Sequence, residues 1–404
     1  MPSEEIDPSR RDAPSFGPIL AAVVAGIALC SYFFVVARTY GLDLHVYLDS
    51  AAAFRDGRNP YLLTFTRSHL PFTYPPFALV VLSSLAWAPF VVAHWFLFLA
   101  SIAVTTAAIE MVLVDRGCTR RASLWCGSFV WACASMLVLE PARSCVDYGQ
   151  IEFVLMFLVV ADILAVPSRF RGILIGVAAA IKLTPLIFVV LLVVRRDWAS
   201  VVRAGLSFVA LTGMSWLLWP GLSRMFWQSD VNSPARVGPI AFASNQSWYA
   251  VVHRSPFPSS GSTPAWLALS AVTALVGTFI AWRCVTTERQ SFALIAVALV
   301  GLLVSPISWT HHWVWVLLIP PMLVGPRRDD TLPVVRGMLW GIVALTIAAP
   351  YWWFSTGGIA DALEAVLPVW TVAALLVWCG TEYVAWRRPP VQPDRDVVER
   401  SSIS

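Results

Sequence analysis

Long apolar stretches alternate with short polar segments over almost the whole chain. A bilayer core of about 30 Å is crossed by about 20 helical residues, so we place membrane-spanning helices by apolar length. We expect them near residues 16–36, 91–114, 123–139, 153–166, 171–195 as two short legs, 200–219, 265–282 and 292–304, with three more before residue 388. The pattern predicts an all-α polytopic membrane protein with about twelve membrane-spanning helices.

Basic residues beside the apolar stretches orient these helices. Cytoplasmic loops of membrane proteins carry an excess of Arg and Lys, and this rule places both termini in the cytoplasm. The outer segments, which we expect to be loops, are then residues 37–90, 140–151, 220–264 and 305–312. Within the first of these, residues 77–87 are predicted to form a helix lying in the outer leaflet, because a full crossing there would put Arg116, Arg120 and Arg121 outside.

The composition agrees with a single membrane domain over residues 16–388. The chain has 404 residues, of which 58% are hydrophobic and 13% charged, and its mean hydropathy is +0.71. Residues 1–15 are expected to form a cytoplasmic tail, and the polar residues 389–404 a disordered one. The net charge of +4 comes from scattered basic residues that report topology, so we expect no nucleic-acid partner. The seven cysteines form no CxxC motif and predict neither a disulfide framework nor a metal cluster.

Lys182 is the only lysine of the chain and lies in the middle of an apolar stretch. Basic residues at both ends of that stretch predict a helix broken near Lys182 and Pro185. Broken helices are tolerated at membrane depth only beside protein or a watery cavity, so the break indicates a cavity. Lys182 then either binds an anionic ligand or forms an ion pair with a carboxylate such as Asp162 or Glu152.

Under this topology, polar residues from distant segments converge on one outward-facing pocket. Asp43 in the first outer segment is either a catalytic carboxylate or a simple helix cap. The histidine pair His311 and His312 lacks the spacing of a zinc site and is expected to bind phosphate, orient a hydroxyl or sit at the interface. Arg55, Arg58 and Arg67 could each bind a phosphate, contact lipid headgroups or remain in solvent. The aromatic residues of this segment are more typical of an interfacial belt than of rings that stack on a sugar.

An ordered set of motifs runs through the chain: DLHVY at 43–47, NPY at 59–61, TYPPF at 73–77, DYGQ at 147–150, IKLTPL at 181–186, NQS at 245–247 and SPISWTHHW at 305–313. This set resembles the integral-membrane mannosyltransferases of the GT-C type. More narrowly, it is similar to the actinobacterial polyprenyl-phosphate-mannose-dependent α-1,2-mannosyltransferases of glycosyltransferase family 87. Relatives often carry Asn where this chain has Glu152, which is a departure from the family pattern.

The resemblance implies a site and a reaction. Asp43 would be the catalytic base, and the residues implied or expected to bind the donor phosphate or substrate are His311, His312, Lys182, Arg67, Arg143, Gln150, Tyr74, His45, Asn245 and Gln246. Mannose would pass with inversion from polyprenyl-phosphate-mannose to a mannosylated glycolipid, a phosphatidylinositol mannoside or lipomannan, at the outer face of the plasma membrane. One base suffices for an inverting transfer, because a leaving phosphate needs only charge stabilisation, so no metal or other cofactor is expected.

Two other functions are compatible with these residues. An arabinofuranosyltransferase that uses the corresponding arabinose lipid would share the scaffold. A transporter or flippase for lipid-linked sugars would also use broken helices and a buried lysine. The lack of a visible internal repeat and the gathering of polar residues on one face count against the transporter.

Overall fold

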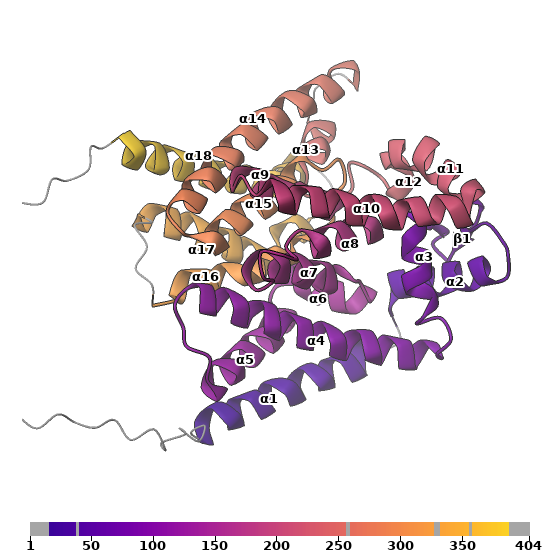
Figure 1. Cartoon of the computed structure of the whole chain (residues 1–404), viewed down its shortest axis with the longest axis horizontal. Helices are drawn as coiled ribbons and strands as arrows, with labels where there is room; N and C mark the ends of the chain where they lie inside the picture. The colour runs from indigo at the N-terminus through magenta and orange to yellow at the C-terminus, as the bar shows by residue number, and fades with distance from the viewer. Residues whose placement is uncertain (1–15, 38–39, 256–258, 327–331, 355–357, 388–404) are drawn as a thin grey trace, which may run out of the picture.

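A computed structural model describes residues 16–37, 40–255, 259–326, 332–354 and 358–387 of the chain (Figure 1). Within these ranges the protein is almost wholly helical, and its one sheet is a two-stranded hairpin. The predicted tails at residues 1–15 and 389–404 lie outside the described residues. The apolar helices, with the composition, make this an all-α, membrane-embedded protein, as predicted.

The elements fall into three groups. The long helices are α1 (Phe16–Tyr32), α4 (Phe90–Asp115), α5 (Ala122–Val138), α10 (Trp198–Leu218), α14 (Ser259–Thr286), α17 (Pro333–Ala348) and α18 (Gly358–Arg387). Shorter apolar pieces are η1 (Phe33–Ala37), α7 (Glu152–Leu164), α8 (Ile173–Ile181), η3 (Thr184–Phe188), α9 (Val189–Val194), α15 (Gln290–Val304), η5 (Thr310–Leu318) and α16 (Ile319–Val324). The remainder are α2 (Leu42–Arg55), η2 (Pro60–Leu62), β1 (Thr64–Phe65), β2 (Leu70–Pro71), α3 (Pro76–Ser83), α6 (Glu140–Tyr148), α11 (Pro220–Gln228), η4 (Asp230–Asn232), α12 (Pro234–Val237), α13 (Trp248–Arg254) and η6 (Pro350–Trp352).

The number of full membrane spans differs from the predicted twelve. Six helices among the described residues are long and apolar enough to cross a bilayer, or seven if α5 and α6, bent by 83°, form one broken span. The other predicted spans coincide with shorter pieces, such as the 13 residues of α7 and the 15 residues of α15. Breaks within the apolar stretches shorten these helices, and twelve full spans are therefore not confirmed.

Helix breaks occur where polar residues interrupt the apolar stretches. Helix α8 ends at Ile181, Lys182 is extended with φ −147° and ψ 131°, and η3 follows from Thr184. This confirms the break predicted at Lys182. The outer segments 140–151 and 220–264 were expected to be loops, but they contain α6, α11, α12 and α13. A proline at the first or second position of α6, α11 and α12 favours these short helices, since its missing N–H has no partner there anyway.

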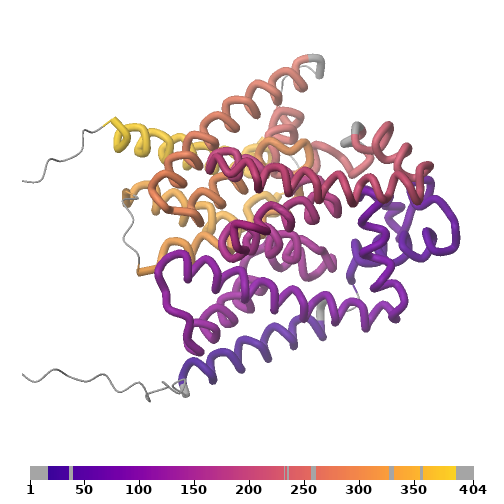
Figure 2. Tube along the Cα trace, in the orientation of Figure 1, coloured from indigo at the N-terminus to yellow at the C-terminus, as the bar shows by residue number. Residues whose placement is uncertain are grey.

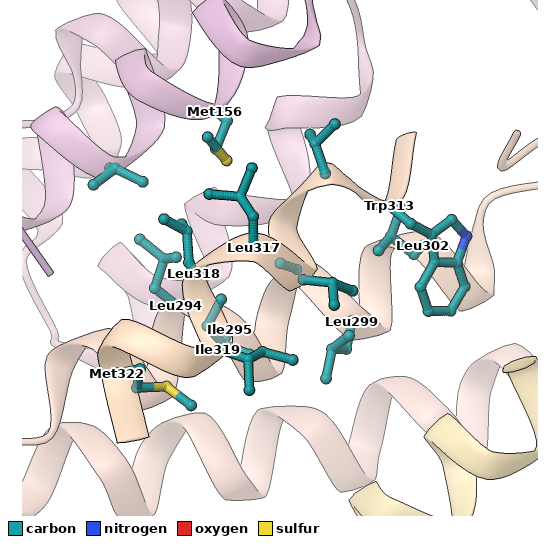
Figure 3. Packing of buried hydrophobic residues seen from close by; sticks show 14 of the residues in the cluster. Met156, Leu294, Ile295, Leu299, Leu302, Trp313, Leu317, Leu318, Ile319 and Met322 are labelled. Carbon is teal, nitrogen blue, oxygen red and sulfur yellow. The ribbon is translucent and has the colours of Figure 1, made fainter. Parts of the chain in front are cut away.

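The main core lies between α7, α15, η5 and α16. Figure 3 shows Met156 facing Leu317 and Leu318, with Leu294, Ile295 and Ile319 beside them. All of these side chains are buried. Helix α15 is central to this core, because nearly every one of its side chains is buried against other helices.

A second apolar cluster holds the first outer segment in place. It joins α2, α3 and the hairpin to α11 through buried residues that include Leu44, Phe72 and Phe226. Figures 1 and 2 show this assembly at one end of the molecule, while the start of α1, the α4–α5 connection and the end of α18 lie at the opposite end. One end of the bundle is thus covered by α2, α3, the hairpin and α11, and the polar site lies near this end.

Candidate active site

Asp43 lies in the first turn of α2 and faces a cavity. Gly41 precedes the helix, and no side chain caps its N-terminus. The Asp43 carboxylate instead accepts a 2.5 Å hydrogen bond from Gln150 Nε2, far along the chain. Capping therefore does not account for the place of Asp43.

Gly149 allows this contact between α2 and the end of α6. It ends α6 in the left-handed conformation with φ +69°, and a Cβ atom built there would lie 2.7 Å from the Leu44 Cβ. Only glycine adopts this conformation without strain and permits so close an approach. The next residue, Gln150, is thereby brought against the first turn of α2.

Two buried tyrosines continue the polar contacts from Gln150. Tyr47 donates a 2.5 Å hydrogen bond to Gln150 Oε1, and the hydroxyl oxygens of Tyr47 and Tyr74 are 2.6 Å apart. Tyr47, Tyr61, Phe72 and Tyr74 are all buried, so the prediction of an interfacial belt is wrong for them. They are buried because α2 and the hairpin pack against α3 and α11.

Lys182 is bound by groups from three other segments. Its ammonium group forms an ion pair with Glu152, lies 3.2 Å from His312 Nε2 and donates a 3.3 Å hydrogen bond to the Tyr74 hydroxyl. Asp162, the other candidate partner, accepts hydrogen bonds from the backbone N–H groups of Gly172 and Ile175 and caps α8. The choice between the two predicted partners therefore falls on Glu152.

The two adjacent histidines differ in their environments. His312 contacts Lys182 and lies 3.5 Å from Glu152 Oε1. His311 is 5% exposed, and neither of its ring nitrogens has a hydrogen-bond partner among the described residues. Buried polar atoms without a partner are rare in native proteins and require an explanation. Because His311 lines the cavity, a ligand would supply that partner.

The principal cavity has a volume of about 280 Å³ and joins these groups in one space. Six of the predicted site residues line it: Asp43, Tyr74, Gln150, Lys182, His311 and His312. A second cavity of about 260 Å³ shares Lys182, Leu183, Thr184, Ser305, Ile307 and His312 with the first. It continues past Glu152 between apolar side chains of α7, η3, α15 and η5, among them Leu155, Phe188, Leu302 and Trp315.

Five predicted site residues do not line either cavity. Arg67 is exposed in the hairpin turn, and Arg143 is half-buried on α6. The His45 ring stacks on Phe90 with 3.9 Å between ring centroids.

The other two, Asn245 and Gln246, support the segment before the histidines. Asn245 donates hydrogen bonds to the carbonyl oxygens of Ile240 and Pro306, and its Oδ1 accepts from Ser308 N–H. The Gln246 N–H donates to the Ser308 carbonyl at 2.8 Å. The NQS motif therefore fixes residues 305–309 and, through them, the start of η5 at Thr310, directly before His311.

Sequence reasoning did not select Tyr47, Glu152 or Asp230 as site residues. Asp230 comes from the outer segment 220–264, lines the cavity and pairs with Arg236 at 3.4 Å. Glu152 carried a signal, since it was both a possible partner of Lys182 and a departure from the family pattern, and Tyr47 lies within the DLHVY motif. Tyr47 on α2 and Asp230 in η4 reach the site through tertiary packing, which no local pattern reveals.

Burial raises the pKa of Asp43 to about 6. The Gln150 hydrogen bond opposes this shift by favouring the charged form, Glu152 raises the pKa further and Lys182 lowers it. The carboxylate is therefore ionised at neutral pH but is more basic than an exposed aspartate. This suits a group that must accept a proton from a hydroxyl.

Glu152, His311 and His312 could together hold a metal ion, because one ligand atom from each lies within 4.8 Å of the others. The Lys182 ammonium group, however, contacts both Glu152 and His312. A divalent cation placed among these three side chains would have to displace that ammonium or endure its repulsion. Glu152 and His312 therefore suit the Lys182 ammonium group that they contact better than a metal ion.

Residues 72–306 match the model of glycosyltransferase family 87. Two relatives, from Mycobacterium tuberculosis and Mycolicibacterium smegmatis, are named polyprenol-phosphate-mannose-dependent alpha-(1-2)-phosphatidylinositol pentamannoside mannosyltransferase. They are 34% and 31% identical to this chain, over 85% of it in both cases and over 78% and 82% of their own lengths.

A further relative from Mycolicibacterium smegmatis is named polyprenol-phosphate-mannose-dependent alpha-(1-2)-phosphatidylinositol mannoside mannosyltransferase. It is 32% identical, and the match covers 90% of this chain and 85% of the relative. No solved structure matches. The family match extends over more than half of the chain and includes the Gln150, Lys182 and NQS segments. The chain belongs to glycosyltransferase family 87.

Proposed function

We propose that this protein transfers mannose from polyprenyl-phosphate-mannose to a phosphatidylinositol mannoside, with inversion and formation of an α-1,2 linkage. The observation that carries the proposal is that Asp43 and Lys182 line one cavity. A carboxylate and a cation on its walls match the two needs of the reaction, a base for the acceptor hydroxyl and a positive group for the leaving phosphate. The names of the relatives supply the substrate classes.

The chemistry proceeds in one displacement. Asp43 accepts the proton of the attacking acceptor hydroxyl as the new bond to the anomeric carbon forms and the bond to the phosphate oxygen breaks. The departing phosphate monoester needs no proton when Lys182 and a histidine stabilise its charge. An attack from the face opposite the phosphate turns a β-linked donor into an α-mannoside. No metal ion takes part in these steps.

The second cavity fits the donor's isoprenoid chain. Its polar end, at Lys182 and His312, adjoins the principal cavity, and its remaining wall is mostly apolar. A phosphate held at Lys182 would then direct the mannose toward Asp43 and the lipid toward the apolar side chains. Burial of several methylene or methyl groups there contributes about 0.8 kcal/mol for each.

The site is proposed to face the outer side of the plasma membrane. The α4–α5 connection, which carries Arg116, Arg120 and Arg121, lies at the end of the molecule opposite α2 and α3 (Figure 1). If the positive-inside rule holds that end in the cytoplasm, both termini are cytoplasmic and the cavity opens outward. Shorter apolar helices, such as α15 and the η5–α16 pair, would complete further crossings beyond the six long ones.

Neither alternative function gains support from the relatives. Their names specify a mannose donor and not an arabinose donor. A family of glycosyltransferases also favours chemistry over translocation.

The test is transfer by the purified protein in detergent, where no second compartment exists. Incubation with polyprenyl-phosphate-mannose and a phosphatidylinositol mannoside is expected to yield a glycolipid with one more mannose, which an exo-α-1,2-mannosidase removes. A product that resists this enzyme would contradict the linkage. Absence of any product, with both lipids recovered intact, would contradict the function.

A further inference from the structure

A continuous line of hydrogen bonds connects the two ends of the site. Lys182 Nζ lies 3.3 Å from the Tyr74 hydroxyl, which lies 2.6 Å from the Tyr47 hydroxyl. Tyr47 in turn contacts Gln150 Oε1 at 2.5 Å, and Gln150 Nε2 contacts Asp43 Oδ2 at 2.5 Å. The participating groups come from α2, the segment before α3, the α6–α7 turn and the α8 break.

The chemistry of the two ends determines the direction of every bond. An ammonium group only donates, an ionised carboxylate only accepts, and a tyrosine hydroxyl has a single hydrogen to donate. Lys182 therefore donates to Tyr74, Tyr47 to Gln150 Oε1, and the Gln150 amide to Asp43. The Tyr74 hydroxyl has two acceptors within reach, the Tyr47 oxygen at 2.6 Å and Gln150 Oε1 at 3.3 Å, and its hydrogen points to the nearer one. The reverse assignment would leave the Tyr47 oxygen and Gln150 Oε1 facing each other at 2.5 Å without a hydrogen between them.

This line of hydrogen bonds acts on Asp43 through the orientation of the Gln150 amide. With its NH₂ group toward Asp43, the amide stabilises an ionised carboxylate. A flipped amide would put Oε1 against the carboxylate oxygen, which is tolerable only when Asp43 is protonated. The Tyr47 hydroxyl opposes that flip because it donates to the amide oxygen on the other side.

We propose that Tyr47 is a positioning residue for the transfer reaction, which holds the Gln150 amide in the orientation that keeps Asp43 ionised. This inference rests on the proposed function, with Asp43 as the base. Tyr47 acts through Gln150, while Tyr74 and Lys182 complete the donor chain behind it. Burial of Tyr47, which is 1% exposed, keeps water from replacing its hydroxyl.

Several other charged and titratable groups surround Asp43. Glu152 raises its pKa, and Lys182 and the Gln150 hydrogen bond lower it. The remaining neighbours are Tyr148 from α6, His94 from α4 beside Gly41 and Gly149, and His311 and His312 from η5. The Tyr47 hydroxyl bonds to Tyr74 and Gln150, so its removal acts on Asp43 through Gln150 and weakens the bond that lowers the pKa of Asp43.

The test compares the pH profiles of kcat/KM for wild type, Tyr47→Phe and Tyr61→Phe. Tyr61 is the matched control, since it is equally buried. Its hydroxyl donates a 2.8 Å hydrogen bond to the Tyr74 carbonyl oxygen and takes no part in the line of hydrogen bonds from Lys182 to Asp43. The acidic limb, which follows ionisation of Asp43, is expected to move to higher pH by about half a unit or more in Tyr47→Phe, the equivalent of a roughly threefold loss on that limb. It is expected to stay in place in Tyr61→Phe.

An acidic limb that stays in place in an active Tyr47→Phe enzyme would overturn the inference. If this variant does not fold, Tyr74→Phe decides. It removes the donor to Tyr47 and is expected to shift the acidic limb in the same direction by a smaller amount. An acidic limb that does not shift would overturn the inference. Wild-type enzyme that forms no mannosylated product would refute the proposed function instead, so the two failures are distinguishable.

Discussion

His311 and His312 are adjacent in the chain, their rings meet at 4.6 Å and 89°, and yet only His312 has a hydrogen-bonding partner among the described residues. Sequence alone could not say which histidine reaches the substrates. The environments separate them: His312 belongs to the Lys182–Glu152 cluster, whereas His311 presents buried, unpaired nitrogens to the cavity. We therefore expect His312 to hold Lys182 in place and His311 to contact the substrates.

His311→Leu is expected to lower kcat/KM by about 100-fold, in line with the loss of one donor to developing charge. The same change should leave the unfolding temperature unchanged or higher, since it removes buried polar atoms that lack partners. Activity assays and thermal unfolding in one detergent measure both effects. Equal losses of activity and stability would instead indicate a packing role for His311.

Glu152→Gln is expected to shift the pH profile of activity. The Glu152 charge raises the pKa of Asp43, which stands at about 6, so its removal lowers that pKa. Asp43 then stays ionised to lower pH, and the acidic limb of kcat/KM moves down, opposite to the shift expected for Tyr47→Phe. Glu110→Gln on α4 is the control, because Glu110 pairs with Arg120 at 3.4 Å and lines neither cavity. An unchanged or upward shift in Glu152→Gln would contradict this electrostatic account.

Metal removal is expected to have no effect on activity. Lys182 occupies the contacts of Glu152 and His312 that a divalent cation would need. Mannosyl transfer by protein dialysed against EDTA, and by the same protein with Mg²⁺, Mn²⁺ or Zn²⁺ restored, checks this. Activity lost with EDTA and recovered with one of these ions would assign the three-residue group to a metal.

Gly149→Ala is expected to reduce both stability and activity. Its φ of +69° costs an alanine roughly 1–2 kcal/mol, and the new Cβ would press on Leu44 and move α2 away from Gln150. Gly127→Ala in α5 is the matched control, because nothing lies within 4 Å of its added Cβ. If Gly149→Ala unfolds at the same temperature as the control and keeps full activity, the close approach of α2 and α6 does not matter.

Much of the architecture could be predicted because membrane burial leaves a strong imprint on sequence. The break at Lys182 followed from one cation within an apolar stretch, and the structure has it at the same residue. The number of full spans could not be obtained in this way, since apolar length does not reveal that α7 and α15 are short helices buried among others. Hydropathy reports that a segment is apolar, but not how many of its residues form one continuous helix.

The candidate site was predictable only in part, for a related reason. Asp43, Lys182 and the histidines are conspicuous as polar residues beside apolar stretches, and the cavity contains them all. Tyr47 has no such signal, because its place in the site depends on how α2 packs against α6 at Gly149. Arg67, equally conspicuous in the sequence, is exposed in a hairpin turn.

The most direct test of the central claim replaces the carboxylate of Asp43 by an amide. Asp43→Asn retains the shape of the side chain but cannot accept the acceptor's proton, and Asp49→Asn changes an exposed aspartate of the same helix in the same way. The measurement is the rate of mannose transfer from polyprenyl-phosphate-mannose to a phosphatidylinositol mannoside by each purified, folded variant. We expect Asp49→Asn to match wild type and Asp43→Asn to lose about 1,000-fold or more; transfer by Asp43→Asn at the wild-type rate would contradict Asp43 as the base.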